Sequence, residues 1–408
     1  MKSIFFLSVI ISLSIILNIY PQQLDKSGGH ARILSLGNNP YVIDPEFIKV
    51  NPAWASEYDN FLWMDIGSKS ASAAGASDGQ FAGVNVRLND RWTLGGIVTV
   101  KNSNPIMSIS VLDPFSIVNQ INNIIGSNKV VELNNNFEAL ASYKFDRITL
   151  GLGAAYSYSQ NNLNYASSSS VKANASQFGL NAGALIKLKR NLLLDVGASL
   201  ILPGASYKPG SGFQTKLSQT IFLVNARAFI NLSERLAIVP ILKLETVSGS
   251  VELNGTSGDL QSTSDIMVGA GTNYRVHRFL LAGGVYFNYN KVTVPQVPGV
   301  SPQLIQSRID FPVWNLGAEW RATRWLIARI GYQAGTSSND YELSASPSTK
   351  NESIYTSYVP GAVTLGLGLR VGRFGLDATI NSDVLRQGLN NIGGGTPTFA
   401  YISSSYAF

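Results

Sequence analysis

The stretch "RITLGLGAAYSYS" at residues 147–159 alternates between two kinds of side chain. The apolar face is formed by Ile148, Leu150, Leu152, Ala154, Tyr156 and Tyr158, and the other face by Thr149, Gly151, Gly153, Ala155, Ser157 and Ser159. A period of two with one apolar face and one small or polar face predicts a β-strand between two environments. The same alternation recurs at 178–188, 363–371 and 374–381, so such strands are the main structural unit of the chain.

Seven short turns that end in arginine connect the predicted strands in pairs. The arginines are Arg91, Arg147, Arg190, Arg235, Arg278, Arg324 and Arg373. Longer connections rich in Ser, Asn, Gly and Pro alternate with these turns, at 160–172, 203–213, 251–264, 292–308, 338–356 and 384–397. Seven turns join fourteen strands, and further strands near 60–71 and 397–408 make sixteen, with fourteen as the alternative count. Short turns at one end and long loops at the other are typical of a transmembrane β-barrel.

The predicted fold class is therefore all-β: a transmembrane antiparallel β-barrel of about sixteen strands, closed because lipid forbids open sheet edges. A large soluble β-protein is the alternative. The predicted strands run about 10–18 residues, whereas strands in globular proteins usually have five or six. Trp92, Trp314, Trp320 and Trp325 fall near strand ends, as an interfacial aromatic girdle requires. Both features favour the barrel.

The composition excludes several kinds of chemistry. The 408 residues include no cysteine, so disulfides, thiolate metal sites and thiol catalysis are excluded. The two histidines, His30 and His277, are poor material for metal binding or acid–base catalysis, and no metal or cofactor site is expected. Charged residues make up 14%, below the roughly 25% of soluble domains. The net charge of +6 forms no basic stripe, so nucleic acid is not an expected partner.

The two ends of the chain carry targeting features. Lys2 precedes the apolar run "IFFLSVIISLSIILNIY", which predicts a secretory signal over 1–23, with an uncleaved anchor as the alternative. The last strand ends in Phe408, with Tyr406 and Ile402 on the same face. This ending resembles the assembly signal of bacterial outer-membrane barrels. It implies the barrel-assembly machinery as a partner and the outer membrane of a Gram-negative-type bacterium as the location.

The segment 24–59 cannot be a strand and is too structured for a linker. Its apolar side chains, among them Phe47 and Trp54, need partners that bury them, and Pro40, Pro45 and Pro52 stiffen its turns. A sixteen-stranded barrel is wide enough to hold such a piece. We therefore expect residues 24–59 to form a plug in the lumen and residues 60–408 to form the barrel.

Charged side chains on the polar strand faces should line the lumen, since each would cost a few kcal/mol near the midplane of the lipid. They include Arg87, Glu138, Asp195, Arg227, Lys243, Glu245, Glu319, Arg329, Arg370 and Asp377. Both signs are present. The interpretation we favour is that these groups pair across the barrel or with the plug, and the alternative is a charge-screened water channel.

The sequences "ARILSLG" and "NNPYVIDPEFIKVNPAWAS" resemble the opening of the FadL-like superfamily of outer-membrane proteins, which transport long-chain fatty acids and hydrocarbons. Arg32, Leu36 and Gly37 match a small/Arg-Leu-Gly stretch of that family. Asn51, Pro52 and Ala53 match its Asn-Pro-Ala motif before the first strand. The resemblance covers roughly residues 28–60. Secretion-associated PorV-type barrels share this opening.

The resemblance implies a hatch that blocks the lumen and a hydrophobic ligand held between hatch and wall. In the family the ligand leaves sideways into the outer leaflet through a gap made by a kinked third strand. Pro105 removes a hydrogen-bond donor at the corresponding place, although a proline there is equally at home in a loop. The chain departs from the family in strand number, because the family has fourteen strands.

The stretch "LDPFSIVNQINNIIGS" at 112–127 predicts a short amphipathic helix in an outer loop. Asp113 is the expected N-cap and Pro114 the first helical residue. The apolar contacts would be made by Phe115, Ile117, Ile121, Ile124 and Ile125. Two interpretations stay open: this face packs on the barrel, or it is a landing site for an apolar molecule.

The favoured function is a barrel that moves hydrophobic small molecules across the outer membrane, with lipid and an apolar ligand as partners. A PorV-like partner in protein secretion or surface attachment is the alternative, followed by a general porin. An enzyme is not expected, because neither histidine is placed at the outer rim. The expected ligand and gating residues are Phe47, Asn51, Pro52, Ala53, Trp54 and Pro105.

Overall fold

The computed structural model describes residues 26–67, 79–101, 106–125, 131–163, 171–210, 214–296, 302–346, 349–380 and 399–408. The expected signal over 1–23 and the expected kink at Pro105 lie outside the described residues. Among the described residues, no helix is both long and apolar enough to cross a membrane.

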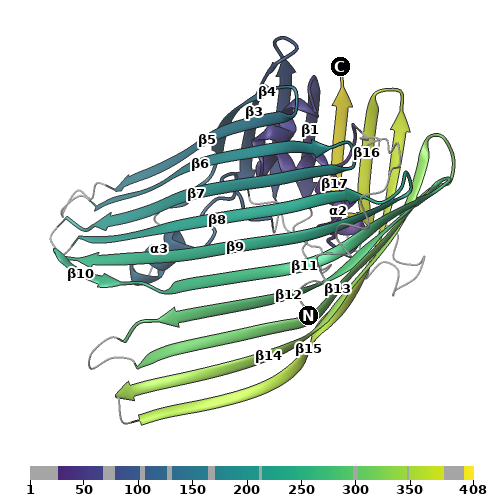
Figure 1. Cartoon of the computed structure of the whole chain (residues 1–408). Helices are drawn as coiled ribbons and strands as arrows, with labels where there is room; N and C mark the ends of the chain where they lie inside the picture. Colours follow the sequence, from purple (N-terminus) through teal and green to yellow (C-terminus); the bar gives the residue numbers. More distant parts are fainter. Residues whose placement is uncertain are drawn as a thin grey trace, which may run out of the picture.

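The described elements are mostly strands (Figure 1). The helices are α2 (His30–Ser35), η1 (Pro45–Lys49), η2 (Pro52–Ser56) and α3 (Ile117–Ile125), of which η1 and η2 are 3₁₀-helices. The strands are β1 (Phe61–Gly67), β2 (Gln80–Arg87), β3 (Trp92–Lys101), β4 (Asn136–Lys144), β5 (Ile148–Leu163), β6 (Val171–Lys189), β7 (Leu192–Lys208), β8 (Thr215–Asn231), β9 (Leu236–Leu253), β10 (Thr256–Asp259), β11 (Ser262–Val276), β12 (Phe279–Val294), β13 (Gln303–Arg321), β14 (Leu326–Ser346), β15 (Thr349–Val371), β16 (Phe374–Ile380) and β17 (Phe399–Ala407).

The sheet closes on itself into a sixteen-stranded antiparallel barrel. β1 pairs with β2 on one side and with β17 on the other, which joins the first and last strands. β9 pairs with β8 and β11, while the four-residue β10 adds to β9 outside the ring. The predicted count of sixteen is confirmed, and the alternative of fourteen is wrong.

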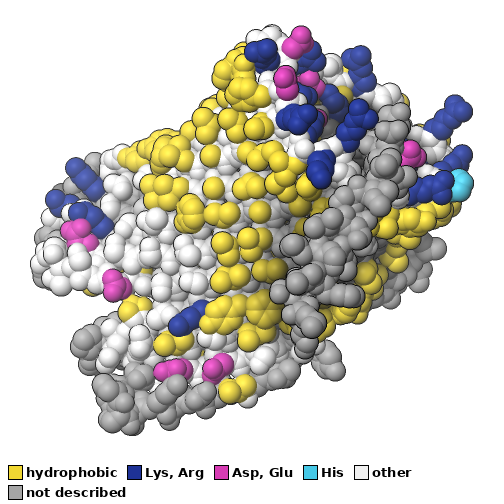
Figure 2. Space-filling view, viewed as in Figure 1, with side chains coloured by type: hydrophobic (Ala, Val, Ile, Leu, Met, Phe, Trp, Pro, Cys, Tyr) yellow, Lys and Arg dark blue, Asp and Glu magenta, His cyan; other side chains and the backbone are white. Residues whose placement is uncertain are grey.

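The strand faces divide as the sequence pattern predicts. Along β5, Leu150, Leu152 and Tyr156 are exposed on the outside, whereas Thr149 and Gly151 are buried inside. Hydrophobic side chains cover much of the outer surface in Figure 2. A closed barrel whose outer face is apolar is the structure of an outer-membrane β-barrel protein.

The seven short turns lie where they are predicted, but several of the expected long connections are strands. The stretch 338–356 consists mostly of the ends of β14 and β15, which only 347–348 separate. Likewise β9 continues to Leu253 and β13 begins at Gln303. In these stretches the composition becomes polar while the backbone pairing of the strands continues. The connections predicted from polar composition alone are therefore too long.

The hydrophobic core lies between the N-terminal segment and the inner wall of the barrel. Its fully buried aromatic side chains form a chain of ring contacts from Trp54 through Tyr58, Phe61 and Trp63 to Phe81. The ring centroids lie between 5.4 and 6.4 Å apart. These contacts fasten the N-terminal segment to β1 and β2.

Candidate functional site

The N-terminal segment fills the lumen, and we call its described part, residues 26–60, the plug. Nearly all of its side chains from Ser27 to Ala55 are buried. The side chain of Asp44 accepts a hydrogen bond from Glu46 N and caps η1, while Asn51 accepts one from Ala53 N and caps η2. A proline follows each cap at the first helical position. The Asn-Pro-Ala motif therefore forms a compact turn inside the barrel.

Glycines on the inner wall let the plug backbone lie directly against the strands. A Cβ added at Gly331 would overlap the backbone nitrogen of Gly37, and one added at Gly183 would overlap the side chain of Asn51. At Gly317 an added Cβ would lie 2.7 Å from the carbonyl oxygen of Leu36. An added Cβ would also meet the plug backbone at Gly151 and Gly197, and plug side chains at Gly271, Gly284 and Gly366. The wall is thus shaped to the plug.

Asparagines on the inner wall satisfy the carbonyl groups of the plug. The side-chain amides of Asn181, Asn273 and Asn315 donate to Lys49 O at 2.9 Å, to Tyr41 O at 2.8 Å and to Gly37 O at 2.7 Å. Because these carbonyls are buried, each would be costly if left without a partner. Sequence reasoning missed these asparagines and glycines. The available signal was the abundance of Gly and Asn on the polar strand faces.

Arg227 joins β8 to the plug. Its guanidinium donates to Asp195 Oδ2 at 2.8 and 2.6 Å, and to the carbonyl oxygens of Pro40 and Val42 at 3.1 Å each. Its Cζ lies 3.5 Å from the ring centroid of Phe47. Both side chains of the ion pair are buried. Asp195 also accepts from the amide of Asn51 at 2.7 Å. Two predicted luminal charges therefore hold two parts of the plug.

A second network of charges lies between α2 and strands β13–β16. Arg32 of the plug donates to Glu319 at 2.9 Å, and Arg329 donates to the same carboxylate at 2.8 Å. Asp377 lies 2.7 Å from Arg329 and 3.0 Å from Arg370. These four predicted luminal residues pair with one another and with the plug, which is the favoured of the two interpretations for luminal charges.

Three further predicted charges lie in the lumen away from these networks. Lys243 contacts Glu245 at 2.8 Å and Asp265 at 3.4 Å. Glu138 accepts a hydrogen bond from Ser110. Arg87 departs from the expectation: it is exposed at the rim that carries the short turns, because it ends β2 there, and it pairs with Asp59 and Asp90.

The titratable side chains of the plug are displaced from their usual behaviour by burial. Burial, with Lys49 nearby, lowers the pKa of His30 to about 3, so this histidine is neutral. Burial raises the pKa of Asp44 and of Glu46 to about 7, against the opposing effects of Arg32 and Lys49. Among the described residues, no group of His, Cys, Asp and Glu is arranged to hold a metal ion.

The segment 106–125 folds into the lumen against the inner wall. Ile117 and Ile121 of α3 are fully buried and pack with Ala205 of β7 and Leu217 of β8. Phe115 packs against a neighbouring buried cluster. Of the two interpretations left open for this helix, packing on the barrel is the one observed. The structure does not describe the side chains of Ile124 and Ile125.

The start of α3 differs from the expectation. The helix begins at Ile117, not at Pro114, because Asp113 and Ser116 both have positive φ. The carboxylate of Asp113 still caps the helix, accepting from Ile117 N at 2.8 Å and from Val118 N at 3.1 Å.

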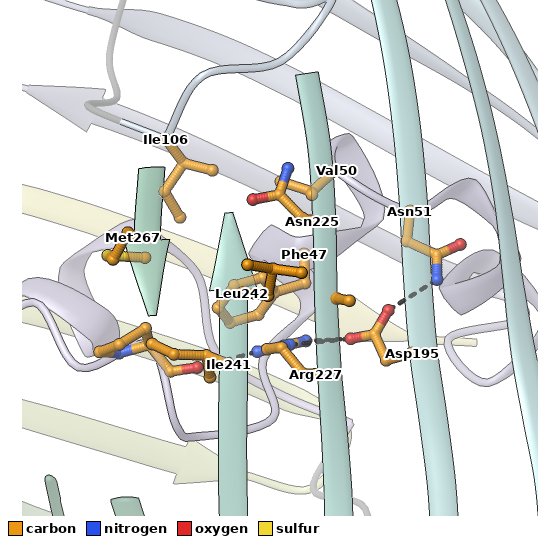
Figure 3. Close-up of a pocket in the computed structure, with 12 residues that line it drawn as sticks. Phe47, Val50, Asn51, Ile106, Asp195, Asn225, Arg227, Ile241, Leu242 and Met267 are labelled. Carbon is orange, nitrogen blue, oxygen red and sulfur yellow. Dashed lines mark hydrogen bonds and ion pairs between the residues drawn. The ribbon is translucent and has the colours of Figure 1, made fainter. Parts of the chain in front are cut away.

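A cavity of about 70 Å³ lies where the plug, the segment 106–125 and the wall meet (Figure 3). Figure 3 shows Phe47 and Val50 of the plug facing Ile106, Ile241 and Met267, with the Asp195–Arg227 pair at one edge. Its lining is Pro40, Phe47, Val50, Asn51, Ile106, Asp195, Asn225, Ala226, Arg227, Ile241, Leu242 and Met267. It is largely apolar with a polar edge, which suits an apolar group better than an ion.

The predicted gating residues occupy two different surroundings. Phe47 and Asn51 line the cavity. Ala53 lies against Gly151, and Trp54 belongs to the aromatic chain that reaches β1 and β2. The structure thus brings only the first two to the cavity, together with the predicted luminal pair Asp195 and Arg227.

No protein-family model matches the sequence, and no curated protein sequence matches it. Solved structures that resemble the fold include a Pseudomonas aeruginosa FadL homologue, with 12% identity, a TM-score of 0.44 and coverage of 91% of this chain and 96% of that one. The P. putida toluene transporter TodX has 9% identity and a TM-score of 0.38, with 94% and 99% of the chains covered. The Neisseria meningitidis FrpB iron transporter has 10% identity and a TM-score of 0.38 over 81% of this chain, which spans 63% of FrpB. Likenesses at these identities and TM-scores do not indicate what this chain binds.

Proposed function

We propose that this protein moves hydrophobic small molecules, of the long-chain fatty acid or hydrocarbon kind, across the outer membrane through its plugged lumen. The observation that carries the proposal is the apolar cavity between plug and wall, lined by Phe47, Ile106, Ile241 and Met267. No covalent step is part of the proposal, and its residues bind and release without reacting.

The cavity is a gap between the plug and the wall. On the opposite side of the plug, the aromatic chain and the network around Arg32 are fully buried. At the cavity the plug is held mainly by Arg227 and by the amide of Asn51. A solute that enters here would have to loosen these contacts.

Within this proposal the predicted gating residues take different roles. Phe47 and Asn51 face the solute, and the 3₁₀-helix η1, which bears Phe47, is the part that moves. Trp54, Pro52 and Ala53 form the fixed end of the plug. Ile117 and Ile121 hold the segment 106–125 in place, and this segment brings Ile106 to the cavity.

A substitution that fills the cavity tests the proposal. Met267 lines the cavity, while its neighbour Val268 points outward and is half exposed, so Val268→Trp is a matched control for Met267→Trp. The assay is uptake of a fluorescent long-chain fatty acid by cells that lack their own transporter. Wild type and Val268→Trp should show saturable uptake, and Met267→Trp should lose it while it still assembles in the outer membrane.

Two outcomes would contradict the proposal. Uptake by Met267→Trp equal to wild type would show that the solute does not pass the cavity. Absence of uptake by assembled wild type, with fatty acid and with an alkane in a growth assay, would reject hydrophobic transport. A protein partner at the outer face, as in the secretion alternative, would then be sought by cross-linking from the long-loop end.

A further inference from the structure

The arginine that ends each short turn recurs around one whole rim of the barrel. All seven arginines, Arg91, Arg147, Arg190, Arg235, Arg278, Arg324 and Arg373, are exposed. Lys and Arg side chains are dense at this end of the molecule in Figure 2. Because the arginine recurs in seven separate turns, its role should act around the whole circumference of the barrel.

The backbone fixes five of these arginines in equivalent positions and the other two one residue earlier. In five of the turns the carbonyl oxygen of the arginine accepts a hydrogen bond from the neighbouring hairpin, for example from Lys144 N to Arg91 O at 2.8 Å and from Arg275 N to Arg235 O at 2.8 Å. In the other two turns the next residue, Asn191 or Trp325, accepts the equivalent bond. The hairpins are therefore joined into a ring from which the arginine side chains project.

An exposed apolar side chain follows most of these arginines. Trp92, Ile148, Phe279, Trp325 and Phe374 come directly after an arginine and are exposed. All of them except Trp325, which precedes β14, are the first residue of a strand and lie on its outer face. Aromatic side chains collect where the membrane meets water. The arginines thus lie one residue beyond the apolar band, at the level of the lipid head groups.

The turns are strongly cationic. Between their strands the seven turns hold seven arginines but only three acidic residues, Asp90, Asp146 and Glu234. No ion pair with a described residue holds Arg147, Arg235, Arg278, Arg324 or Arg373. These guanidinium groups remain available for anions from outside the chain.

We propose that this arginine rim binds the phosphate groups of anionic phospholipids in the leaflet that surrounds the short turns, which is the inner leaflet of the outer membrane. Guanidinium groups bind phosphate with paired hydrogen bonds. The lipid tails would then lie along the exposed aromatic side chains next to the arginines. The rim would fix the depth and tilt of the barrel.

A lipid leaflet fits the distribution of the arginines better than a protein partner does. A leaflet touches the barrel on every side, and the arginines occupy every one of the seven short turns. A protein partner would contact one sector or cover the end of the barrel, and it would not require an aromatic neighbour that faces lipid. The assignment of the leaflet rests on the outer-membrane location, in which short turns face the periplasm.

The test measures lipid preference of the full chain in nanodiscs made of equal parts phosphatidylglycerol and phosphatidylcholine. The variant carries Arg235→Gln, Arg278→Gln and Arg324→Gln. The matched control carries Lys172→Gln, Lys208→Gln and Lys291→Gln, three exposed cations at the opposite end of the strands. Native mass spectrometry after detergent release counts the phosphatidylglycerol molecules that stay bound.

Wild type and the lysine control should retain phosphatidylglycerol over phosphatidylcholine, and the arginine variant should lose about fivefold in affinity at each altered turn, since a basic residue near an anionic surface contributes about that factor. High salt should weaken the preference of wild type. A preference that is absent in wild type, or kept by the arginine variant, or lost equally by the lysine control, would overturn the proposal. If the arginine variant no longer binds an anionic periplasmic protein that wild type binds from cell extracts, while its lipid preference is unchanged, the rim binds a protein instead of lipid. Since no transport substrate is used, the result is independent of the proposed transport.

Discussion

Replacing Arg227 by methionine should loosen the plug beside the cavity. The substitution keeps much of the volume of the side chain and removes its charge and its four hydrogen bonds to Asp195, Pro40 and Val42. The carboxylate of Asp195 would stay buried with only the amide of Asn51 as a described partner. Two backbone carbonyls of the plug would lose their donor.

The expected effect is large because the ion pair is buried. Removing one partner of a buried pair typically costs about 3–5 kcal/mol. A cost of about 3 kcal/mol corresponds to a more than hundredfold rise in the population of the open plug. Arg308 is the matched control: it bonds Asp310 at 2.8 Å, but its side chain is 42% exposed and touches no described plug residue. Arg308→Met should change the same population less than about fivefold.

The absence of cysteine from the chain supplies a clean assay. Val42 is buried beside Arg227, so Val42→Cys reports the opening of this part of the plug through its rate of reaction with a maleimide. When closing is faster than labelling, the rate follows the open population. The rate should rise at least about a hundredfold in Arg227→Met and change little in Arg308→Met.

A partial rescue distinguishes the buried charge from lost packing. Asp195→Asn added to Arg227→Met removes the orphaned carboxylate, so the double variant should label more slowly than Arg227→Met alone. Equal labelling of wild type and Arg227→Met would refute the view that this pair holds the plug. A double variant that labels as fast as the single one would assign the effect to packing.

Three further outcomes are expected. Gly331→Ala places a methyl group where the backbone of Gly37 lies, so it should raise the labelling rate of the cysteine reporter, whereas Gly96→Ala, with its nearest neighbour at 3.6 Å, should not. His30 has a pKa lowered to about 3 in the seated plug, and it regains about 6.5 on release. Through His30, release therefore binds a proton below pH 6.5, so acid favours release by this group. Asp44 and Glu46, whose pKa burial raises to about 7, act in the opposite direction and cancel in a ratio to a His30 variant. Hydrogen exchange at α2 in wild type, divided by that in His30→Asn at the same pH, should rise up to about twenty-fivefold from pH 7 to pH 5; a constant ratio would contradict this. Asp113→Ala removes the cap of α3 and should speed hydrogen exchange there about fivefold, for a loss of about 1 kcal/mol.

The barrel was predictable because its two surroundings impose a period of two on every strand. In β5 and β6 each residue meets either lipid or the lumen, so the sequence records the fold residue by residue. That record ends where the strands leave the apolar band. At 338–356 the composition is polar and the alternation fades, so the sequence no longer distinguishes a paired strand from a loop.

The candidate site was predictable only in part. Phe47 and Asn51 stand out because a buried-looking segment before a barrel has to lie inside it. Ile106, Ile241 and Met267 are far apart in the sequence and meet only after the strands have taken their places. The amphipathic pattern of α3 likewise predicts a helix with an apolar face, but it holds no information about which wall that face covers.

The plug contacts the strands on both sides of the junction at which β1 pairs with β17. Toward the last strands, the hydroxyl of Ser403 accepts a hydrogen bond from Ala31 N at 2.9 Å, and the hydroxyl of Thr379 donates to Ala31 O at 2.8 Å. Toward the first strands, Asn85 donates to Tyr58 O at 3.1 Å. The plug therefore bridges the junction between β1 and β17 at which the barrel closes. These contacts cannot form until β17 is in place, so docking of the plug and closure of the barrel become one late step of assembly. A chain without the plug is therefore expected to lose barrel closure as well.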